Sequence, residues 1–523
     1  MSHFLIVLIT SCVLFSNQSE SARILAVFPI ASISHQVVFR PITQELARRG
    51  HEVTVITPDP AFPKGETPQN LTEIDVHDIT YDIWKEKFMT APKGNKNDLY
   101  LHIQIYLDSI LLMFDAQLKD ENVRNAIEDK NKQFDLVLLE AAVRPGLIFS
   151  HIYNAPVIMI SSYGASFDNF EIVGAPIHPL LYPIGIRQRL NNLSIWEKIT
   201  ELYLHYKSDE MASSNYALEN DFLRKRFGPG IPKIEELNNN VHMIFLNIHP
   251  IFEGIRPVPP AVLFMGGLHQ KPEKELPKDL KNYLDSSKNG VIYLSFGTNV
   301  DPKLLPPHFI QTLINALSKL PYDVLWKWNE DELPGRTENI KISKWLPQSD
   351  LLRHPKIKLF ITQGGLQSTD EAITAGVPLI GIPMLGDQWF NVERYVYHKI
   401  GQGLDMETLT EEDLTNAIKT IIRDDSYRQN IIRLRSVIYD QPQPPLERAI
   451  WWTEYVLRHG GARHLRGPAA NMSWAEYLEL ELILVIVSIL LLAITIFMIA
   501  SYYIFLCAKN KFYSNQSFSI IRY

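Results

Sequence analysis

An uncharged run of 26 residues, Leu482–Cys507, constrains the chain more than any other feature of its sequence. About 20 apolar residues in a helix cross the ~30 Å hydrocarbon layer of a bilayer, so this run is predicted to be a single membrane-spanning helix. Acidic residues immediately precede the helix in the juxtamembrane segment 466–481, whereas the charged residues of the tail 508–523 are all basic. Basic flanks stay in the cytosol, which predicts a cytosolic tail and a body on the lumenal side.

The amino terminus is predicted to be a signal peptide, residues 1–21, cleaved near Ala22. It is mostly apolar and ends in small and polar residues, although its first residues lack the usual Lys or Arg. The two cysteines are Cys12, inside the signal peptide, and Cys507, at the cytosolic end of the membrane helix. The body is therefore expected to have no disulfide and to depend on packing alone.

Glycosylation sequons agree with a lumenal body. Asn70, Asn192 and Asn471 are each followed by the x-Ser/Thr pattern on the predicted lumenal side. The sequon at Asn515 lies in the predicted cytosolic tail and should not be modified.

Composition excludes two classes of protein. The 523 residues are 46% hydrophobic with a formal net charge of −7, which is typical of folded domains with large cores and not of a disordered chain. No Lys/Arg block stands out, so a nucleic-acid surface is not expected.

The first half of the body begins with a βαβ pattern. A β-like run, Arg23–Phe28, precedes an expected helix, Ile33–Arg49, and a second β-like run, Glu52–Thr57. Gly50 suits the position that closes the helix, while Pro41 either kinks the helix or is its first residue. Further strands are predicted at Phe134–Leu139 and Pro156–Ser161, and the region 163–240 is assigned to lids and helices around a pocket.

The second half follows a Pro- and Lys-rich linker, Gln270–Lys278. Helical stretches such as Phe309–Leu320 and Leu414–Arg423 alternate with β-like runs, which predicts a second parallel sheet. The predicted strands are Val291–Phe296, Asp323–Trp328, Ile340–Ser343, Leu359–Thr362 and Leu379–Ile382. The fold class is therefore α/β, with two Rossmann-like doubly wound domains, 22–269 and 270–465, facing across a cleft.

One stretch of the second half, Trp345–Gln388, holds most of the chemistry. It combines an aromatic ring, a Gly-Gly turn into a helix, a carboxylate and an Asp-Gln pair. A nucleotide-sugar needs such groups: a ring for the base, backbone N–H groups for phosphates and polar side chains for hydroxyls. The helix is expected to run to Ala375 and to end at Gly376.

Two of these assignments have simpler alternatives. Trp345 could be an interdomain or core tryptophan, the more common fate of that residue type. Ser368 and Glu371 have the S-x-x-E spacing of a helix capping box, and on spacing alone capping is the better interpretation.

These residues together resemble the membrane-anchored UDP-glycosyltransferases with two Rossmann domains, the GT-B type, and the wording QGGLQSTDEA is similar to insect members. The resemblance also includes His35 after the first strand, the run Ser295–Thr298 and the terminal membrane helix. It covers nearly the whole chain. It implies that the donor is a UDP-sugar, bound as a co-substrate without a cofactor. No Asp-x-Asp metal signature lies near the donor motif, so no metal is expected.

The resemblance also implies roles for individual residues. Trp345 would stack on uracil, Gln348 would reach the base or ribose, and Glu371 would hold ribose hydroxyls. The diphosphate would contact Ser368 and the backbone N–H groups where the Gly364-Gly365 turn leads into the helix. Asp387 and Gln388 would bind sugar hydroxyls. The full set of predicted donor residues is Gly297, Thr298, Trp345, Gln348, Gln363, Gly364, Gly365, Gln367, Ser368, Glu371, Asp387 and Gln388.

Two donor residues depart from the family pattern. Plant and vertebrate members usually have histidine where this chain has Gln363. An amide can donate a hydrogen bond to a phosphate but adds no positive charge. Gln367, where asparagine is common, is a milder change.

His35 is the candidate general base, because an imidazole at the end of the first strand would lie at the cleft and titrates near neutral pH. Glu140, at the end of the FDLVLLE strand, is the candidate partner that orients it, in place of the family's usual aspartate. Asp135 lies earlier on that strand and should point elsewhere.

The predicted function is inverting transfer of a hexose, most simply glucose, from a UDP-sugar to a hydroxyl of a small lipophilic acceptor, as in detoxification. UDP-glucuronate is the alternative donor, and an inactive membrane-tethered binder of lipophiles is the alternative class. The protein is expected to be a single-pass type I protein of the endoplasmic reticulum membrane, although its tail lacks a dilysine signal. Acceptor identity and homo-oligomerisation are left open.

Overall fold

The computed structural model describes residues 21–129, 132–165, 168–183, 185, 187, 192–470 and 472–520. The predicted signal peptide, apart from Ser21, and the sequon asparagine Asn471 lie outside the described residues. Residues up to Ala470 form one compact unit, and the residues after it form a second unit.

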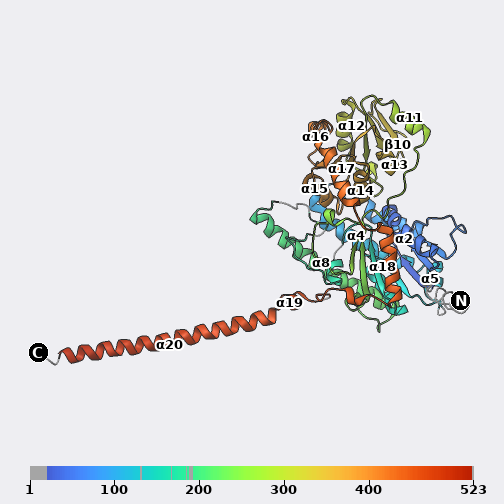
Figure 1. Ribbon diagram of the computed structural model, residues 1–523. Helices are drawn as coiled ribbons and strands as arrows, with labels where there is room; N and C mark the ends of the chain where they lie inside the picture. Colours follow the sequence, from blue (N-terminus) through green and yellow to red (C-terminus); the bar gives the residue numbers. More distant parts are fainter. Residues whose placement is uncertain are drawn as a thin grey trace, which may run out of the picture. The chain divides into compact units, whose positions relative to one another are not determined.

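Two parallel sheets form the compact unit (Figure 1). The first sheet has the order β3-β2-β1-β4-β5-β6-β7. Its strands are β1 (Arg23–Val27), β2 (Glu52–Thr57), β3 (Leu71–Asp75), β4 (Leu136–Glu140), β5 (Val157–Ser161), β6 (Val241–Leu246) and β7 (Val262–Phe264). Short β-branched and apolar runs of this kind suit strands that are buried on both faces.

The second sheet has the order β10-β9-β8-β11-β12-β13. Its strands are β8 (Val291–Ser295), β9 (Asp323–Lys327), β10 (Ile340–Ser343), β11 (Ile357–Thr362), β12 (Leu379–Gly381) and β13 (Gly401–Gly403). All pairings in both sheets are parallel, so the predicted doubly wound class is confirmed. The four strands β3, β6, β7 and β13 had not been predicted.

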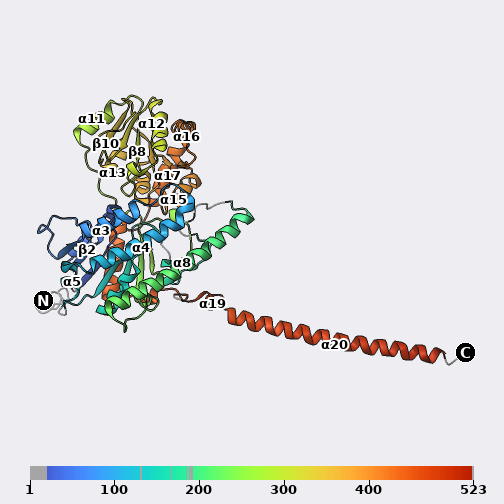
Figure 2. The same ribbon diagram turned by 180° about the vertical axis from the view of Figure 1, so that it is seen from behind.

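Helices of the first half cover both faces of the first sheet (Figures 1 and 2). They are α2 (Ile33–Arg48), α3 (His77–Trp84), α4 (Leu99–Gln117), α5 (Glu121–Ile127), α6 (Ile148–Tyr153), α7 (Asn169–Ile172), α8 (Ile195–Phe227), α9 (Ile234–Leu237) and α10 (Pro250–Glu253). Pro41 lies inside α2, so of the two alternatives for this residue, the first helical position is excluded. Gly50 follows the helix with φ +99°, a conformation that glycine adopts without steric cost.

Helices of the second half are α11 (Lys278–Ser286), α12 (Pro307–Ser318), α13 (Gln348–Leu352), α14 (Leu366–Ala375), α15 (Gln388–Tyr397), α16 (Glu411–Arg423), α17 (Ser426–Tyr439) and α18 (Pro445–Arg458). The last of these, α18, lies against α2 of the first half (Figure 1). Arg49 and Glu454 form an ion pair between the two segments at 3.2 Å. The last helix of the body, α18, therefore packs on the first half and not on the second.

The second unit contains α19 (Trp474–Tyr477) and α20 (Leu480–Ile520). The stretch Leu480–Lys511 of α20 is long and apolar enough to span a membrane. The stretch Lys96–Gln117, which includes α4, passes the same length and composition test, but it is partly buried in the body as a core helix. The membrane-spanning assignment therefore rests on α20.

Packing of α18 on the first sheet can be tested at Ile450, which is fully buried among residues of α2, β1 and β4. Ile450→Ala should lower the free energy of unfolding by about 2–5 kcal/mol, because it leaves a cavity that the sheet cannot fill. Ile432→Ala on α17, where the side chain is 42% exposed, should cost less than about 1 kcal/mol. Urea unfolding of the detergent-solubilised chain would measure both, and equal losses would contradict this packing.

Candidate active site

A cavity of about 670 Å³ is lined by residues of both halves of the body. In each parallel sheet, several lining residues lie at or just beyond the carboxyl ends of strands, where doubly wound folds bind ligands. Of the predicted site residues, all line the cavity except Glu140 and Gly364. The lining set is His35, Gly297, Thr298, Trp345, Gln348, Gln363, Gly365, Gln367, Ser368, Glu371, Asp387 and Gln388.

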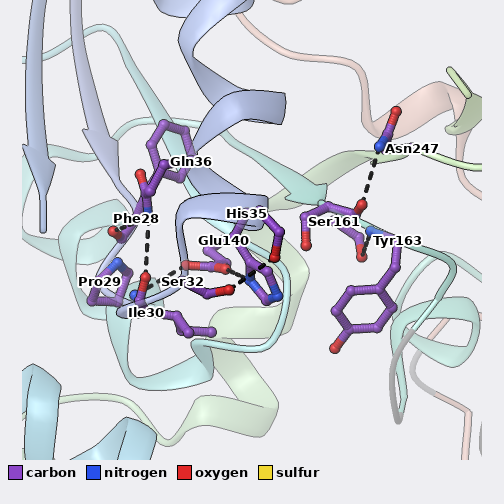
Figure 3. A network of polar contacts seen from close by, with 12 residues as sticks. Phe28, Pro29, Ile30, Ser32, His35, Gln36, Glu140, Ser161, Tyr163 and Asn247 are labelled. Atoms are coloured by element: carbon purple, nitrogen blue, oxygen red, sulfur yellow. Dashed lines mark hydrogen bonds and ion pairs between the residues drawn. The ribbon is translucent and has the colours of Figure 1, made fainter. Parts of the chain in front are cut away.

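His35 and Glu140 form a close pair at the first sheet (Figure 3). His35 Nδ1 lies 2.6 Å from Glu140 Oε1, and the Ile30 backbone N–H donates to Glu140 Oε2 at 3.3 Å. Burial raises the pKa of Glu140, while the His35 contact favours its ionised form. In the tautomer that carries its proton on Nδ1, His35 donates to an ionised Glu140, and Nε2 can accept a hydrogen bond. The predicted pairing is therefore present in the structure.

The position of Glu140 explains why it reaches His35 and Asp135 does not. Glu140 is the last residue of β4, at the carboxyl edge where α2 begins next to β1. Asp135 lies before the strand, and its Oδ2 accepts the Arg23 backbone N–H at 2.8 Å. The expectation that Asp135 points elsewhere is confirmed.

Ser32 joins the base-bearing helix to the second half. It precedes α2, and its backbone oxygen accepts the His35 N–H at 2.9 Å. Its hydroxyl makes no capping bond to the helix and instead accepts from Asn299 Nδ2 at 3.1 Å. Asn299 follows Gly297 and Thr298, so the loop after β8 contacts the start of the helix that carries His35.

A hydrogen-bonded network connects Gln348 with Ser368 and Glu371 of α14. Gln348 Nε2 donates to Ser368 Oγ at 2.9 Å and to Glu371 Oε2 at 2.7 Å, while Tyr293 donates to Gln348 Oε1 at 2.9 Å. Burial raises the pKa of Glu371, and the Gln348 bond opposes that rise. The network holds these side chains in place at the wall of the cavity.

The capping-box alternative for Ser368 and Glu371 is wrong. The helix α14 begins at Leu366, its N-cap is Gly365, and no side chain caps it. Ser368 is therefore already in the first turn. Backbone N–H groups at this helix start remain without side-chain caps, which suits an anionic ligand.

The loops that follow β8 and β11 approach each other closely at Gly297 and Gln363. Gly297 has φ +75°, and a Cβ added to it would lie 2.5 Å from Gln363 Nε2. Gln363 is 8% exposed, and its Oε1 has no hydrogen-bond partner among the described residues. Gly364, with φ +92°, packs against α15 and does not line the cavity. Only glycine fits at 297 without displacing the Gln363 amide.

Asp387 and Gln388 begin α15 at the same cavity. Gln388 Oε1 accepts the backbone N–H groups of Met384 and Leu385 at 2.8 and 2.9 Å, which fixes its amide. Asn391 donates to Asp387 Oδ2 at 2.9 Å. Burial raises the pKa of Asp387 to about 6, although Asn391 and His35 favour its ionised form.

Trp345 is 67% exposed and lines the cavity. The alternative of a core tryptophan is therefore wrong, whereas the cavity that Trp345 lines is formed by residues of both halves. An exposed indole beside a cavity is available to stack on a planar ring. It follows the end of β10, as predicted.

The first half contributes an aromatic wall near His35. Trp84 stacks on Phe88 at 4.1 Å between ring centroids, and Tyr106 meets both rings edge-on. Tyr163 lies 5.8 Å from the His35 ring. A lipophilic molecule placed beside His35 would meet these apolar surfaces.

Several lining residues had not been predicted: Tyr163, Glu253, Asn299, Lys327 and Asn391. Asn391 could have been found, because it lies one helical turn after Asp387. Glu253, Tyr163 and Lys327 reach the cavity through the tertiary fold, for which their local sequence gives no signal.

Comparison with known proteins agrees with this architecture. The family model described as UDP-glucoronosyl and UDP-glucosyl transferase matches residues 23–514. The ecdysteroid UDP-glucosyltransferase of Spodoptera littoralis nuclear polyhedrosis virus is 36% identical over 92% of this chain and 96% of its own length. UDP-glucosyltransferase 2 of Dactylopius coccus is 32% identical over 92% and 93%, respectively.

Solved structures share the fold at low identity. The glycotransferase of kitacinnamycin has a TM-score of 0.57 at 17% identity, covering 84% of this chain and 99% of its own. The calicheamicin glycosyltransferase CalG4 has a TM-score of 0.54 at 16% identity with the same coverage. These are GT-B structures. By its sequence over nearly its full length, and by a fold that agrees, the chain belongs to the UDP-glycosyltransferase family.

Proposed function

We propose that this UDP-glycosyltransferase moves glucose from UDP-glucose to a hydroxyl of a small lipophilic acceptor, with inversion at the anomeric carbon. The observation that carries the proposal is the 2.6 Å contact between Glu140 and His35. His35 lines the same cavity as the predicted donor residues other than Gly364. Curated relatives named UDP-glucosyltransferases support glucose as the sugar. UDP-glucuronate is the second candidate donor, and a panel of UDP-sugars with product mass as readout separates the two.

In this proposal His35 is the general base. Nδ1–H donates to Glu140, so Nε2 accepts the proton of the acceptor hydroxyl as its oxygen attacks the anomeric carbon. The bond to UDP breaks in the same step, and the imidazolium that forms is stabilised by the carboxylate behind it. One displacement converts an α-linked donor to a β-glycoside.

Different residues of the second half would bind the uracil, the ribose and the diphosphate of UDP. Trp345 would stack on uracil, and Glu371, fixed by Gln348, would accept ribose hydroxyls. The start of α14 would face the diphosphate with its backbone N–H groups, together with Ser368 and the turn at Gly297. Asp387 and Gln388 would bind sugar hydroxyls.

The acceptor would occupy the first-half side of the cavity, against the aromatic wall of Trp84, Phe88, Tyr106 and Tyr163. Several relatives are named ecdysteroid UDP-glucosyltransferases, so polycyclic alcohols are the first acceptors to try, together with phenols. A detoxification role would follow from broad use of such acceptors. An inactive binder would instead take up UDP and lipophiles without forming product.

The body is proposed to face the lumen of the endoplasmic reticulum, anchored by α20. Asn70 and Asn192 are exposed, as glycan acceptors must be. Immunostaining with organelle markers tests this location, and signal at the plasma membrane alone would contradict it.

His35→Ala should lower the transfer rate by about 10²–10⁴-fold and leave the Kd for UDP within about twofold, because the base acts on the acceptor. Product formation by mass spectrometry and UDP titration of the solubilised chain measure the two quantities. His308→Ala, at an exposed histidine of α12, is the matched control and should be unchanged. A His35→Ala protein as active as wild type would refute the mechanism.

Asp387 predicts a pH dependence of sugar binding. Its raised pKa of about 6 means that it is ionised at pH 7.5 and takes up a proton as the pH falls below about 6. An ionised carboxylate accepts hydroxyl protons more strongly, so the Kd for UDP-glucose should rise about fivefold between pH 7.5 and pH 5. Asp387→Asn should bind UDP-glucose weakly at both pH values. The same pH dependence in Asp387→Asn would show that another group is responsible.

A further inference from the structure

We propose that Lys327 is the cation that binds the diphosphate of the donor, a role that neither the sequence motif nor the comparisons assign. This inference rests on the proposed UDP-sugar function and names one more residue of that site.

The need for a cation follows from charge. The diphosphate of a UDP-sugar carries two negative charges, whereas a helix start supplies only about half of a positive charge. Gln363, at the position where plant and vertebrate members usually have histidine, is neutral. A cation from elsewhere in the fold would make up the difference.

Four side chains with permanent positive charge line the cavity: Arg40, Lys271, Lys274 and Lys327. Arg40 is engaged in the first half, where its Nη2 donates to the Asp59 backbone oxygen at 2.7 Å. Lys271 and Lys274 belong to the linker, whose backbone bonds Arg353 and Asp350 on the side of Trp345. Only Lys327 adjoins the turn expected to face the phosphates.

Lys327 is held at that turn by its place in the sheet. It is the last residue of β9, which pairs with β8, the strand that leads into Gly297. Its Nζ donates to the Gly297 backbone oxygen at 2.8 Å and to Asn329 Oδ1 at 3.3 Å. A Cβ added to Gly297 would lie 2.5 Å from Gln363 Nε2, so Lys327 and Gln363 are both neighbours of this glycine.

The ammonium group of Lys327 has capacity for a further ligand. Both of these oxygens are neutral, and among the described residues no carboxylate forms an ion pair with Nζ. Burial lowers the pKa of Lys327, and the more distant Asp301 opposes that change. An arriving phosphate would supply the counter-charge that this partly buried cation lacks.

The test compares ligands with and without phosphates on the solubilised full-length chain. Lys327→Met should raise the Kd for UDP at least tenfold and leave the Kd for uridine within twofold, because uridine has no phosphate. Lys327→Arg should keep the Kd for UDP within about threefold. Lys303→Met, at an exposed lysine paired with Glu330, is the matched control and should bind both ligands as wild type does.

Uridine binding also reports whether Lys327→Met is folded. A Lys327→Met protein that binds UDP as tightly as wild type would overturn the proposal, and so would an equal loss for uridine and UDP. Failure of the wild-type protein to bind UDP would instead refute the proposed donor, which keeps the two claims separate.

Discussion

The shared direction of the strands is the constraint on which the active site depends. All pairings in both sheets are parallel, so every loop at a carboxyl edge lies at the same end of its sheet. Glu140 ends β4, Lys327 ends β9, and Gly297 and Gln363 follow β8 and β11. Residues separated by hundreds of positions therefore line one cavity, except Glu140, which contacts the lining residue His35.

Contacts between the halves join the donor side to the base. Asn299, in the loop after β8, donates to Ser32, whose backbone oxygen receives the His35 N–H. Gln367, in the first turn of α14, donates to the Ser162 backbone oxygen of the first half at 2.7 Å. A donor that orders the β8 loop and α14 would thus also order the surroundings of the base. Under the proposed function, these hydrogen bonds between the two halves would link donor binding to the position of His35.

The sequence predicted the features that depend on local patterns. Apolar runs located the central strands, and the alternation with helices predicted two doubly wound sheets. The pairing of Glu140 with His35 was predicted from their positions after two strands together with the family resemblance, not from local pattern alone. The strands β3, β6, β7 and β13 were missed, and β7 and β13 have only three residues each, which carry little periodicity.

Features set by tertiary contacts were beyond local reasoning. The S-x-x-E spacing favoured a cap, but α14 begins two residues before Ser368 and Glu371 bonds Gln348, 23 positions away in sequence. The exposure of Trp345 and the approach of Lys327 to Gly297 likewise depend on how strands are ordered in the sheet. Residue type alone favoured a buried position for Trp345, and it gave no indication that Lys327 lies at the cavity.

The anomeric configuration of the product tests the central claim most directly, namely that a base from the first half drives one displacement on a donor held by the second. Proton NMR of the glucoside formed from UDP-glucose and a simple phenol would measure the coupling between its first two sugar protons. The account predicts the large coupling of a β-glucoside. The small coupling of an α-glucoside would contradict it, because retention needs a second displacement or a different attack geometry.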